Sequence, residues 1–315
     1  FLILKTYNEL ALNVTDPWNH RSNVDLVPFL NKTHFEIEEM FLECKFRGIP
    51  VKCSEILRRV MTPKGICYTY NMEWFHTIFD DKISKHFDSY GRYECEQEPQ
   101  WTLDDGFKSK TSGSPVRASM NNEVSFLLKI NIDELSQIPE NGLFYRYFLH
   151  FPNEIITPSM QPDFLGMGID MLLTLLAKTK KSSESFRGFT PENRGCYYQD
   201  ERKLQLFKAY TKLNCEVECY VNFTLSNYGC VSYLLPHNES AKICDSAVDL
   251  QMLHDTLSSF PIDNKDFCGC LPTCNNIEYS KKSENSFIIV QNKSVNYYTT
   301  QIKIKFEDNL MIEAL

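Results

Sequence analysis

The sequence lacks the long apolar segments of a membrane span and the basic charge of a nucleic-acid binder. Its longest apolar runs, such as 169–177, fall far short of the ~20 residues that a membrane helix needs. The formal net charge is −8, so no excess of basic residues is available to neutralise phosphates. The start shows no signal peptide, and residue 1 is Phe rather than Met. We therefore expect a fragment that reaches its compartment through segments outside this chain.

Motifs of catalysis and metal binding are lacking as well. The chain contains no Gly-x-Ser-x-Gly elbow, no phosphate-binding loop and no dinucleotide-binding glycine pattern. Its 7 histidines form neither His-x3-His nor His-Glu-x-x-His, spacings that place two metal ligands on one helix face. The sequence thus predicts a protein that is not an enzyme and that uses no cofactor or metal.

Cysteine, by contrast, is abundant. The chain has 12 cysteines, most of them between Cys196 and Cys274. In a reducing cytosol such a cluster suggests a structural zinc site or redox chemistry, whereas an oxidising compartment favours disulfides. Five Asn-x-Ser/Thr sequons support the second environment, because they accept glycan only in the secretory pathway. They begin at Asn13, Asn31, Asn222, Asn238 and Asn292.

The order of predicted elements is strands, helices, strands, which is typical of an α+β fold with a mixed or antiparallel sheet. Apolar residues at helical spacing predict helices at 34–46, 54–60, 201–220 and 247–260. Aromatic and β-branched runs predict strands at 67–70 and 144–151, and alternation predicts a half-buried strand around 302–306. Segment 171–180 fits either a buried strand or a short helix, and 76–123 is interpreted as long surface loops.

The cysteine spacing suggests how a helix and a strand are joined. Cys215 and Cys219 are four residues apart and face the same side of a predicted helix. Cys268 and Cys270 point the same way if their segment is extended. Two such rows can form a ladder of bridges, each closing a loop of about 50 to 80 residues and contributing on the order of 4 kcal/mol.

These cysteines and several short motifs resemble the degenerin/epithelial sodium channel family. The run Cys196, Cys215-x3-Cys219, Cys230, Cys244 and Cys268-Gly-Cys-Leu-Pro-x-Cys274 is similar to that family's cysteine-rich region. Cys44-Lys-Phe-Arg-Gly-x4-Cys53 and Thr62-x2-Gly65-x-Cys67-Tyr-Thr-Tyr-Asn71 resemble its finger signature. The stretches Trp101-Thr-Leu-Asp-Asp-Gly-Phe107 and Arg187-Gly-Phe-x-Pro191 are similar to the insect pickpocket branch. The matches cover most of residues 35–280, in order.

The resemblance implies an ectodomain of palm, β-ball, finger and thumb, like that of the acid-sensing ion channels. It divides the chain into an N-terminal palm or β-ball segment (1–33), finger helices (34–66), palm, β-ball and finger loops (67–190), a cysteine-rich thumb (191–274) and C-terminal palm strands (275–315). The palm sheet is expected to combine strands near 67–71, 144–151 and 285–307.

The resemblance also implies a set of disulfides. Carried over by position, the pairs are Cys44–Cys53, Cys196–Cys274, Cys215–Cys270, Cys219–Cys268 and Cys230–Cys244. One further thumb bridge of acid-sensing members is absent, because Tyr228 stands in place of one of its cysteines. Cys67 would pair with a cysteine that precedes this chain; here it is either unpaired or bonded to Cys95.

The function implied is that of a trimeric sodium or cation channel subunit at the plasma membrane, with this chain on the extracellular side. The thumb would move against the palm and so pull on a membrane helix that follows residue 315. Related subunits, sodium ions and the membrane would be the partners. The alternative, from another class, is a disulfide-rich secreted or receptor-like binding module without a pore.

Acidic residues offer one hypothesis for the stimulus. They cluster at 80–81, 94–98, 104–105 and 245–255. Carboxylates that face each other across the finger and thumb would have raised pKa values and would bind protons or cations. Solvated surface loops are the plainer interpretation of the same residues.

Overall fold

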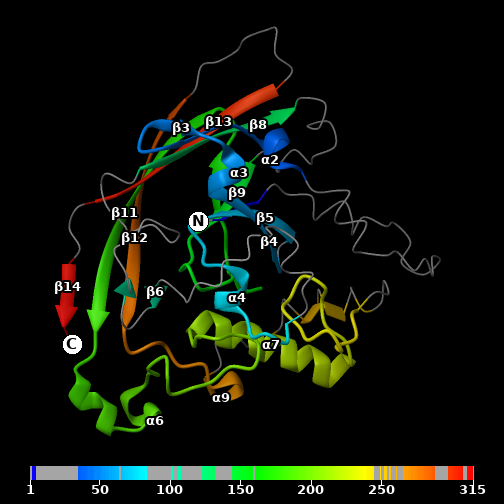
Figure 1. The fold of residues 1–315 in the computed structure, drawn as a ribbon, viewed down its shortest axis with the longest axis vertical. Helices are drawn as coiled ribbons and strands as arrows, with labels where there is room; N and C mark the ends of the chain where they lie inside the picture. Colours follow the sequence, from blue (N-terminus) through cyan, green and yellow to red (C-terminus); the bar gives the residue numbers. More distant parts are fainter. Residues whose placement is uncertain are drawn as a thin grey trace.

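A computed structural model describes the chain in segments (Figure 1). They are 2–4, 35–63, 65–83, 101–102, 106–107, 123–131, 144–158, 160–244, 265–287, 297–307 and 311–314, with positions 249, 252–253, 255–256 and 260 between them.

The larger of two main sheets is built around one long strand, β11 (Ile169–Lys181). Its path continues from β11 to β13 (Tyr297–Phe306), β8 (Val124–Asn131), β2 (Phe41–Phe46) and β3 (Ile49–Val51). On the other side of β11 lies β12 (Asn276–Phe287), an antiparallel partner over its whole length. The C-terminal strand β14 (Met311–Ala314) and β13 both run parallel to β11. β11 therefore pairs with β12, with β13 and with the C-terminal strand β14.

The second sheet is antiparallel throughout and has five strands. Its order is β10 (Asp163–Gly166), β9 (Phe144–Phe148), β1 (Leu2–Leu4), β5 (Gly65–Tyr70) and β4 (Leu57–Thr62). A small hairpin joins β6 (Trp101–Thr102) to β7 (Gly106–Phe107).

One hydrophobic core holds the two sheets together. Leu173 of β11 and Ile302 of β13 are fully buried, and they belong to the same packed cluster as Tyr145 of the second sheet. Buried and half-buried residues alternate along β11, as expected for a strand that has one face against the core. The apolar face of β11 therefore fixes the register of the strands around it.

Within the described segments, the helices are short, with one exception. The short helices are α2 (Ile37–Met40), α3 (Cys53–Ile56), α4 (Phe75–Ile78), the 3-10 turn η2 (Glu184–Gly188), α6 (Pro191–Arg194) and α9 (Lys265–Cys268). The exception is α7 (Lys212–Tyr228), at the lower end of the molecule in Figure 1. Thr211 caps its start by accepting a hydrogen bond from the Asn214 amide, and Gly229 ends it in the left-handed conformation.

Two of the predicted helices are wrong. Segment 34–46 is helical only over α2 and then becomes strand β2, and 54–60 leaves α3 to form β4. A tight turn at Arg47 and Gly48, both with positive φ, folds β2 back on β3. Pairing of β2 with β8 and of β4 with β5 supplies the backbone hydrogen bonds that a helix would have made internally. Segment 34–66 is therefore mainly strand rather than finger helix.

The boundaries of the main helix also differ from the prediction. It was expected at 201–220, but α7 starts at Lys212. The apolar residues before it, Leu206 and Phe207, are buried against the Phe79 segment, so their spacing reflects tertiary packing. The predicted helix at 247–260 has helical positions at 249, 252–253 and 255–256, position 260 is not helical, and its other residues lie outside the described segments.

The strand predictions agree more closely with the structure. Strands occur at 67–70 and 302–306 as expected, and the strand predicted at 144–151 is shorter and ends at 148. Segment 171–180, which fitted either a strand or a helix, is a strand. They do not share one sheet, however. β5 and β9 belong to the five-stranded sheet, whereas β13 pairs with β8 and β11 in the other. Strands of both sheets bury apolar side chains in the same core. Their apolar patterns therefore do not indicate which sheet each strand belongs to.

Candidate functional site

The candidate site is the insert between β11 and β12, defined here as residues 182–275. Lys180 near the end of β11 lies opposite Asn276 at the start of β12, so the chain leaves and re-enters the sheet at one place. Helix α7 is the main element of the insert. The insert is therefore joined covalently to the sheet at a narrow base.

Disulfides turn the insert into a cross-linked unit. Cys196–Cys274 closes a 78-residue separation at the base, Cys215–Cys270 spans 55 residues and Cys219–Cys268 spans 49. Cys230–Cys244 adds a short loop of 14 residues beyond the helix. Cys215 and Cys219 face the same way on α7, and their partners lie at the end of α9 and just after it. These four pairs coincide with those implied by the family resemblance.

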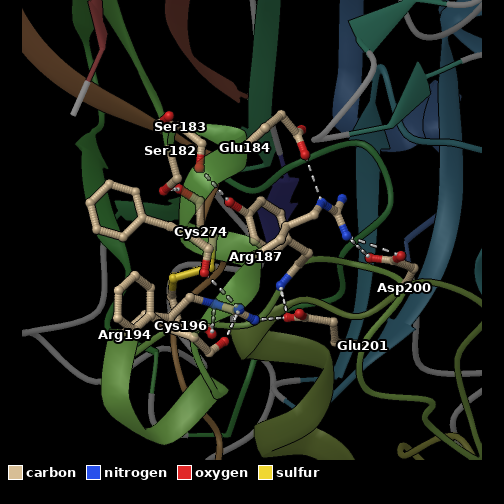
Figure 2. Close-up of polar contacts among 12 residues, drawn as sticks. Ser182, Ser183, Glu184, Arg187, Arg194, Cys196, Asp200, Glu201 and Cys274 are labelled. Atoms are coloured by element: carbon tan, nitrogen blue, oxygen red, sulfur yellow. Dashed lines mark hydrogen bonds and ion pairs between the residues drawn. A yellow bond between two sulfur atoms is a disulfide. The ribbon is translucent and has the colours of Figure 1, made fainter.

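A cluster of polar contacts surrounds the basal disulfide (Figure 2). The Ser182 hydroxyl donates to the Cys274 carbonyl at 2.8 Å, and the Ser182 amide donates to Asn275. Arg187 pairs with Glu184 at 3.0 Å and with Asp200 at 3.1 Å. The segment that leaves β11 is thus hydrogen-bonded to the segment that enters β12 where the insert begins.

Arg194 is the buried member of this cluster. Its side chain is 3% exposed, and it forms an ion pair with Glu201. The same guanidinium donates to the carbonyls of Phe189 at 2.7 Å and Cys196 at 3.1 Å. Removing one partner of such a buried pair typically destabilises a protein by about 3–5 kcal/mol. Arg194 therefore fixes the loop before Cys196 far more firmly than the exposed Arg187 pairs do.

An aromatic ring joins the two arginines. Tyr198 is fully buried, with the Arg187 guanidinium 4.0 Å and the Arg194 guanidinium 4.8 Å from its ring centroid. Its hydroxyl donates to the Ser183 carbonyl at 3.2 Å. Cation–π contacts strengthen when they are desolvated, so the ring helps to order the whole base of the insert.

The insert also touches the segment that contains α4. Backbone hydrogen bonds join Lys208 to Ile78 and Asp80 to Leu206. The rings of Phe79 and Phe207 lie 5.3 Å apart, and Lys208 pairs with the exposed Asp81 at 2.7 Å. This contact is mostly apolar and backbone-mediated, so it resists changes in salt.

A buried carboxyl group marks a second contact, between the start of α7 and the loop after β9. Glu154 is 3% exposed, accepts a hydrogen bond from the Phe151 amide at 3.3 Å and lies near Thr211 and Glu216. Desolvation by burial raises the pKa of Glu154 to about 7, opposed by the hydrogen bond with Thr211. The carboxyl therefore titrates near neutral pH while it faces the insert.

The same contact contains more hydrogen-bond acceptors than donors. The Asn214 side-chain amide donates to the Asn153 carbonyl at 3.0 Å. The side-chain oxygens of Asn153 and Asn214 are buried, and neither accepts a hydrogen bond from the described part of the chain. A proton on Glu154 would add a hydrogen-bond donor to a contact in which two buried amide oxygens have none.

Other predicted site residues lie elsewhere. Cys44–Cys53 joins β2 to α3, far from the insert in sequence. Cys67 is a buried thiol outside any disulfide; it contacts the Thr62 hydroxyl at 3.2 Å, and burial raises its pKa to about 12. Cys95 lies outside the described residues.

The sequons and the acidic clusters are only partly described. Asn222 is exposed on α7 and Asn238 is exposed in a loop, whereas Asn13, Asn31 and Asn292 lie outside the described segments. Asp81 meets the insert, but its partner there is Lys208 rather than a carboxylate. The hydrogen bond with Lys208 lowers the pKa of Asp81, opposite to the raised pKa that the acidic hypothesis required. The acidic residues at 94–98, 104–105 and 245 fall outside the described chain.

Two kinds of feature are absent from the described residues. No described helix is long and apolar enough to cross a membrane. No group of three or more His, Cys, Asp or Glu side chains within the described segments is arranged to hold a metal ion.

Sequence reasoning missed Glu154 and Arg194. Glu154 follows a strand and a proline without any charged neighbour in the chain, so nothing local indicated burial. Arg194 sits beside Cys196, and that proximity to a predicted basal cysteine was the one available signal.

Comparisons with known proteins bear on what this arrangement is for. Residues 5–313 match the family described as amiloride-sensitive sodium channel. The chain is 28% identical over 230 residues to pickpocket protein 11 of Drosophila melanogaster, which covers 69% of this chain and 43% of that protein. It is 18% identical over 283 residues to sodium channel protein Nach of Drosophila virilis, with 90% and 65% coverage. It is 23% identical over 293 residues to acid-sensing ion channel 1A of Danio rerio, with 90% and 50% coverage.

The chain spans only 43%, 65% and 50% of these three relatives, so each is substantially longer. The relatives include Drosophila proteins, as the pickpocket-like motifs had indicated, and also a vertebrate channel. Because the family match runs through nearly all of its residues, the chain belongs to the amiloride-sensitive sodium channel family, whose members are ion channels and not enzymes.

Proposed function

We propose that the chain is the extracellular domain of a sodium or cation channel subunit, which assembles as a trimer in the plasma membrane. Family membership supports this, as do relatives named as sodium and acid-sensing channels. The pore and its ion selectivity are assigned to membrane helices outside this chain, for which the greater length of the relatives leaves room.

The disulfide-bonded insert is proposed to act as a lever on the pore. One observation carries this idea: β11 enters the insert and also pairs in parallel with β14, the last strand of the chain. The bridges inside the insert prevent it from absorbing motion internally. Movement of α7 would then pass through the base to β11 and β14, and from there to a membrane helix. In the terms of the family, residues 191–274 are the thumb.

Protons are the stimulus that the contacts of the insert support best. Glu154 titrates near neutral pH at the interface between α7 and the loop after β9. Its protonated form removes a buried negative charge close to Glu216 and supplies a donor to an acceptor-rich contact. Acidification is therefore expected to strengthen the contact between the start of α7 and the loop after β9.

N-linked glycans are proposed on the sequons Asn13, Asn31, Asn222, Asn238 and Asn292. Asn238 and Ser240 are both exposed, so this site is accessible in the folded chain. At Asn222 the asparagine is exposed but Thr224 is fully buried on α7. Glycan addition at Asn222 therefore has to precede folding of the helix.

The channel assignment is tested by recording from cells that express the complete protein of which this chain is part. We expect a sodium-dependent inward current that changes when the external pH falls, and surface protein that cross-links as a trimer. Secretion of the complete protein into the medium, without any current under varied stimuli, would favour the binding-module alternative.

The lever is tested by breaking one bridge of the ladder. Cys215→Ser with Cys270→Ser removes a cross-link that closes a 55-residue separation, worth about 4 kcal/mol in the chain-entropy model. We expect a weaker stimulus response at equal surface expression. The matched control is Cys230→Ser with Cys244→Ser, a short loop away from the ladder. Unchanged gating in the first double variant would refute the lever.

Glu154→Gln tests the buried carboxyl. Because the pKa of Glu154 is raised from 4.5 to about 7, the folded chain binds more protons than the unfolded chain between these values. The free energy of unfolding therefore falls as pH rises through this window, by up to about 3 kcal/mol. The variant should be more stable than the native chain at pH 8 and similar at pH 4.5, as measured by denaturant unfolding. Glu55→Gln, which changes an exposed residue, is the control; equal pH dependence in all three proteins contradicts the assignment.

The glycan proposal is tested at the described sequon whose asparagine and serine are both exposed, Asn238 and Ser240. Asn238→Gln should remove one glycan, seen as a single downward step in gel mobility that disappears after enzymatic deglycosylation. Ser240→Ala should give the same step, because it destroys the sequon without changing the asparagine. If neither variant migrates faster than the native protein, Asn238 carries no glycan.

A further inference from the structure

Two exposed phenylalanines stand beside the base of the insert. Phe186 is 44% exposed and Phe189 is 56% exposed, and their ring centroids lie 6.1 Å apart. Apolar rings gathered on a surface, unlike scattered single ones, indicate contact with another apolar phase.

The loop that carries these rings is held in place. The Phe189 amide donates to the Phe186 carbonyl at 3.1 Å, and the Phe186 amide donates to Ser183 at 3.0 Å. The buried Arg194 donates to both phenylalanine carbonyls, at 2.7 Å to Phe189 and 3.4 Å to Phe186. The exposure of the two rings is therefore a property of an ordered loop.

The register of β14 on β11 shows where this loop lies relative to the C-terminal strand. Ala314 of β14 lies opposite Lys181 of β11, and η2 begins at Glu184, directly after that strand. Figure 1 shows the C-terminus beside the end of β11, with the turn of η2 just below it. A chain that continues from β14 in the same direction passes the level of Phe186 and Phe189.

Most basic side chains near the loop are paired within the chain. Lys180 pairs with Glu278, Arg187 pairs with Glu184 and Asp200, and the buried Arg194 pairs with Glu201. Lys181, at the end of β11 before the two rings, is exposed. A lysine beside apolar rings is a combination found on surfaces that rest on lipid headgroups.

We propose that Phe186 and Phe189 insert into the headgroup region of the bilayer and so anchor the base of the insert to the membrane surface. This rests on the proposed function, because it places a membrane helix after β14. The rings would give the lever a fixed point: α7 moves while the loop between β11 and Cys196 stays at the lipid surface. The occupant is lipid, not a protein partner.

The test uses the complete protein in proteoliposomes, with Phe189→Trp as a fluorescent reporter. Lipids brominated along their acyl chains quench tryptophans that reach them, and acrylamide quenches those in water. The unmodified protein supplies the background from its own tryptophans. Phe287→Trp is the matched control: Phe287 is 83% exposed and lies opposite Ile169, at the far end of β11. At ~3.3 Å per residue, that end is about 40 Å from Lys181.

We expect the Phe189→Trp reporter to lose fluorescence in brominated lipid and to emit at shorter wavelength, while the Phe287→Trp reporter responds to acrylamide alone. Quenching of the Phe189→Trp reporter by acrylamide alone places the loop in water and overturns the proposal. Resistance to both quenchers places it against protein, a membrane helix or another subunit, and also overturns it. Sodium flux measured in the same proteoliposomes reports the proposed function separately.

Discussion

The structure depends on a covalent closure at one point, where the chain leaves β11 and re-enters the sheet at β12. Cys196–Cys274 joins the two crossings, and Ser182, Tyr198 and Arg194 tie the adjoining loop to the same place. Without this closure, a long insert between two antiparallel strands would swing on two independent tethers. With it, the insert has one covalent attachment point, and its orientation is coupled to the long strand that organises the larger sheet.

The contacts between the insert and the rest of the molecule differ in kind. The contact with the α4 segment is made by Phe79 and Phe207 and by backbone hydrogen bonds, which change little with pH or salt. The contact near the start of α7 contains Glu154, whose protonation state changes close to neutral pH. A rigid body held by one constant contact and one titratable contact is suited to rocking, because a change in protonation biases one side only. The disulfides keep that bias from being lost inside the insert.

Much of this could be predicted from the sequence, and the reasons are local. Alternation identified β13, and the spacing of Cys215, Cys219, Cys268 and Cys270 indicated the ladder, because both signals depend on neighbours in the chain. The helix predicted at 34–46 failed because β2 is stabilised by pairing with β8, a strand about 80 residues away. The start of α7 was misplaced because Leu206 and Phe207 are buried by a distant segment. The burial of Glu154 could not be predicted, because residues distant in the sequence remove its side chain from water.

The proposed lever also requires a support, and the disulfides do not supply one. They make the insert rigid, but rigidity alone does not decide whether the insert translates or rotates. Arg194 addresses this point, since its buried guanidinium is shared between Glu201, which follows the basal disulfide, and the carbonyls of the loop with Phe186 and Phe189, which precedes it. If that loop rests on the membrane surface, the same residue connects the support to the moving part. Rotation about the base then becomes the easiest motion, and β14, paired to the end of β11, is the element that it displaces.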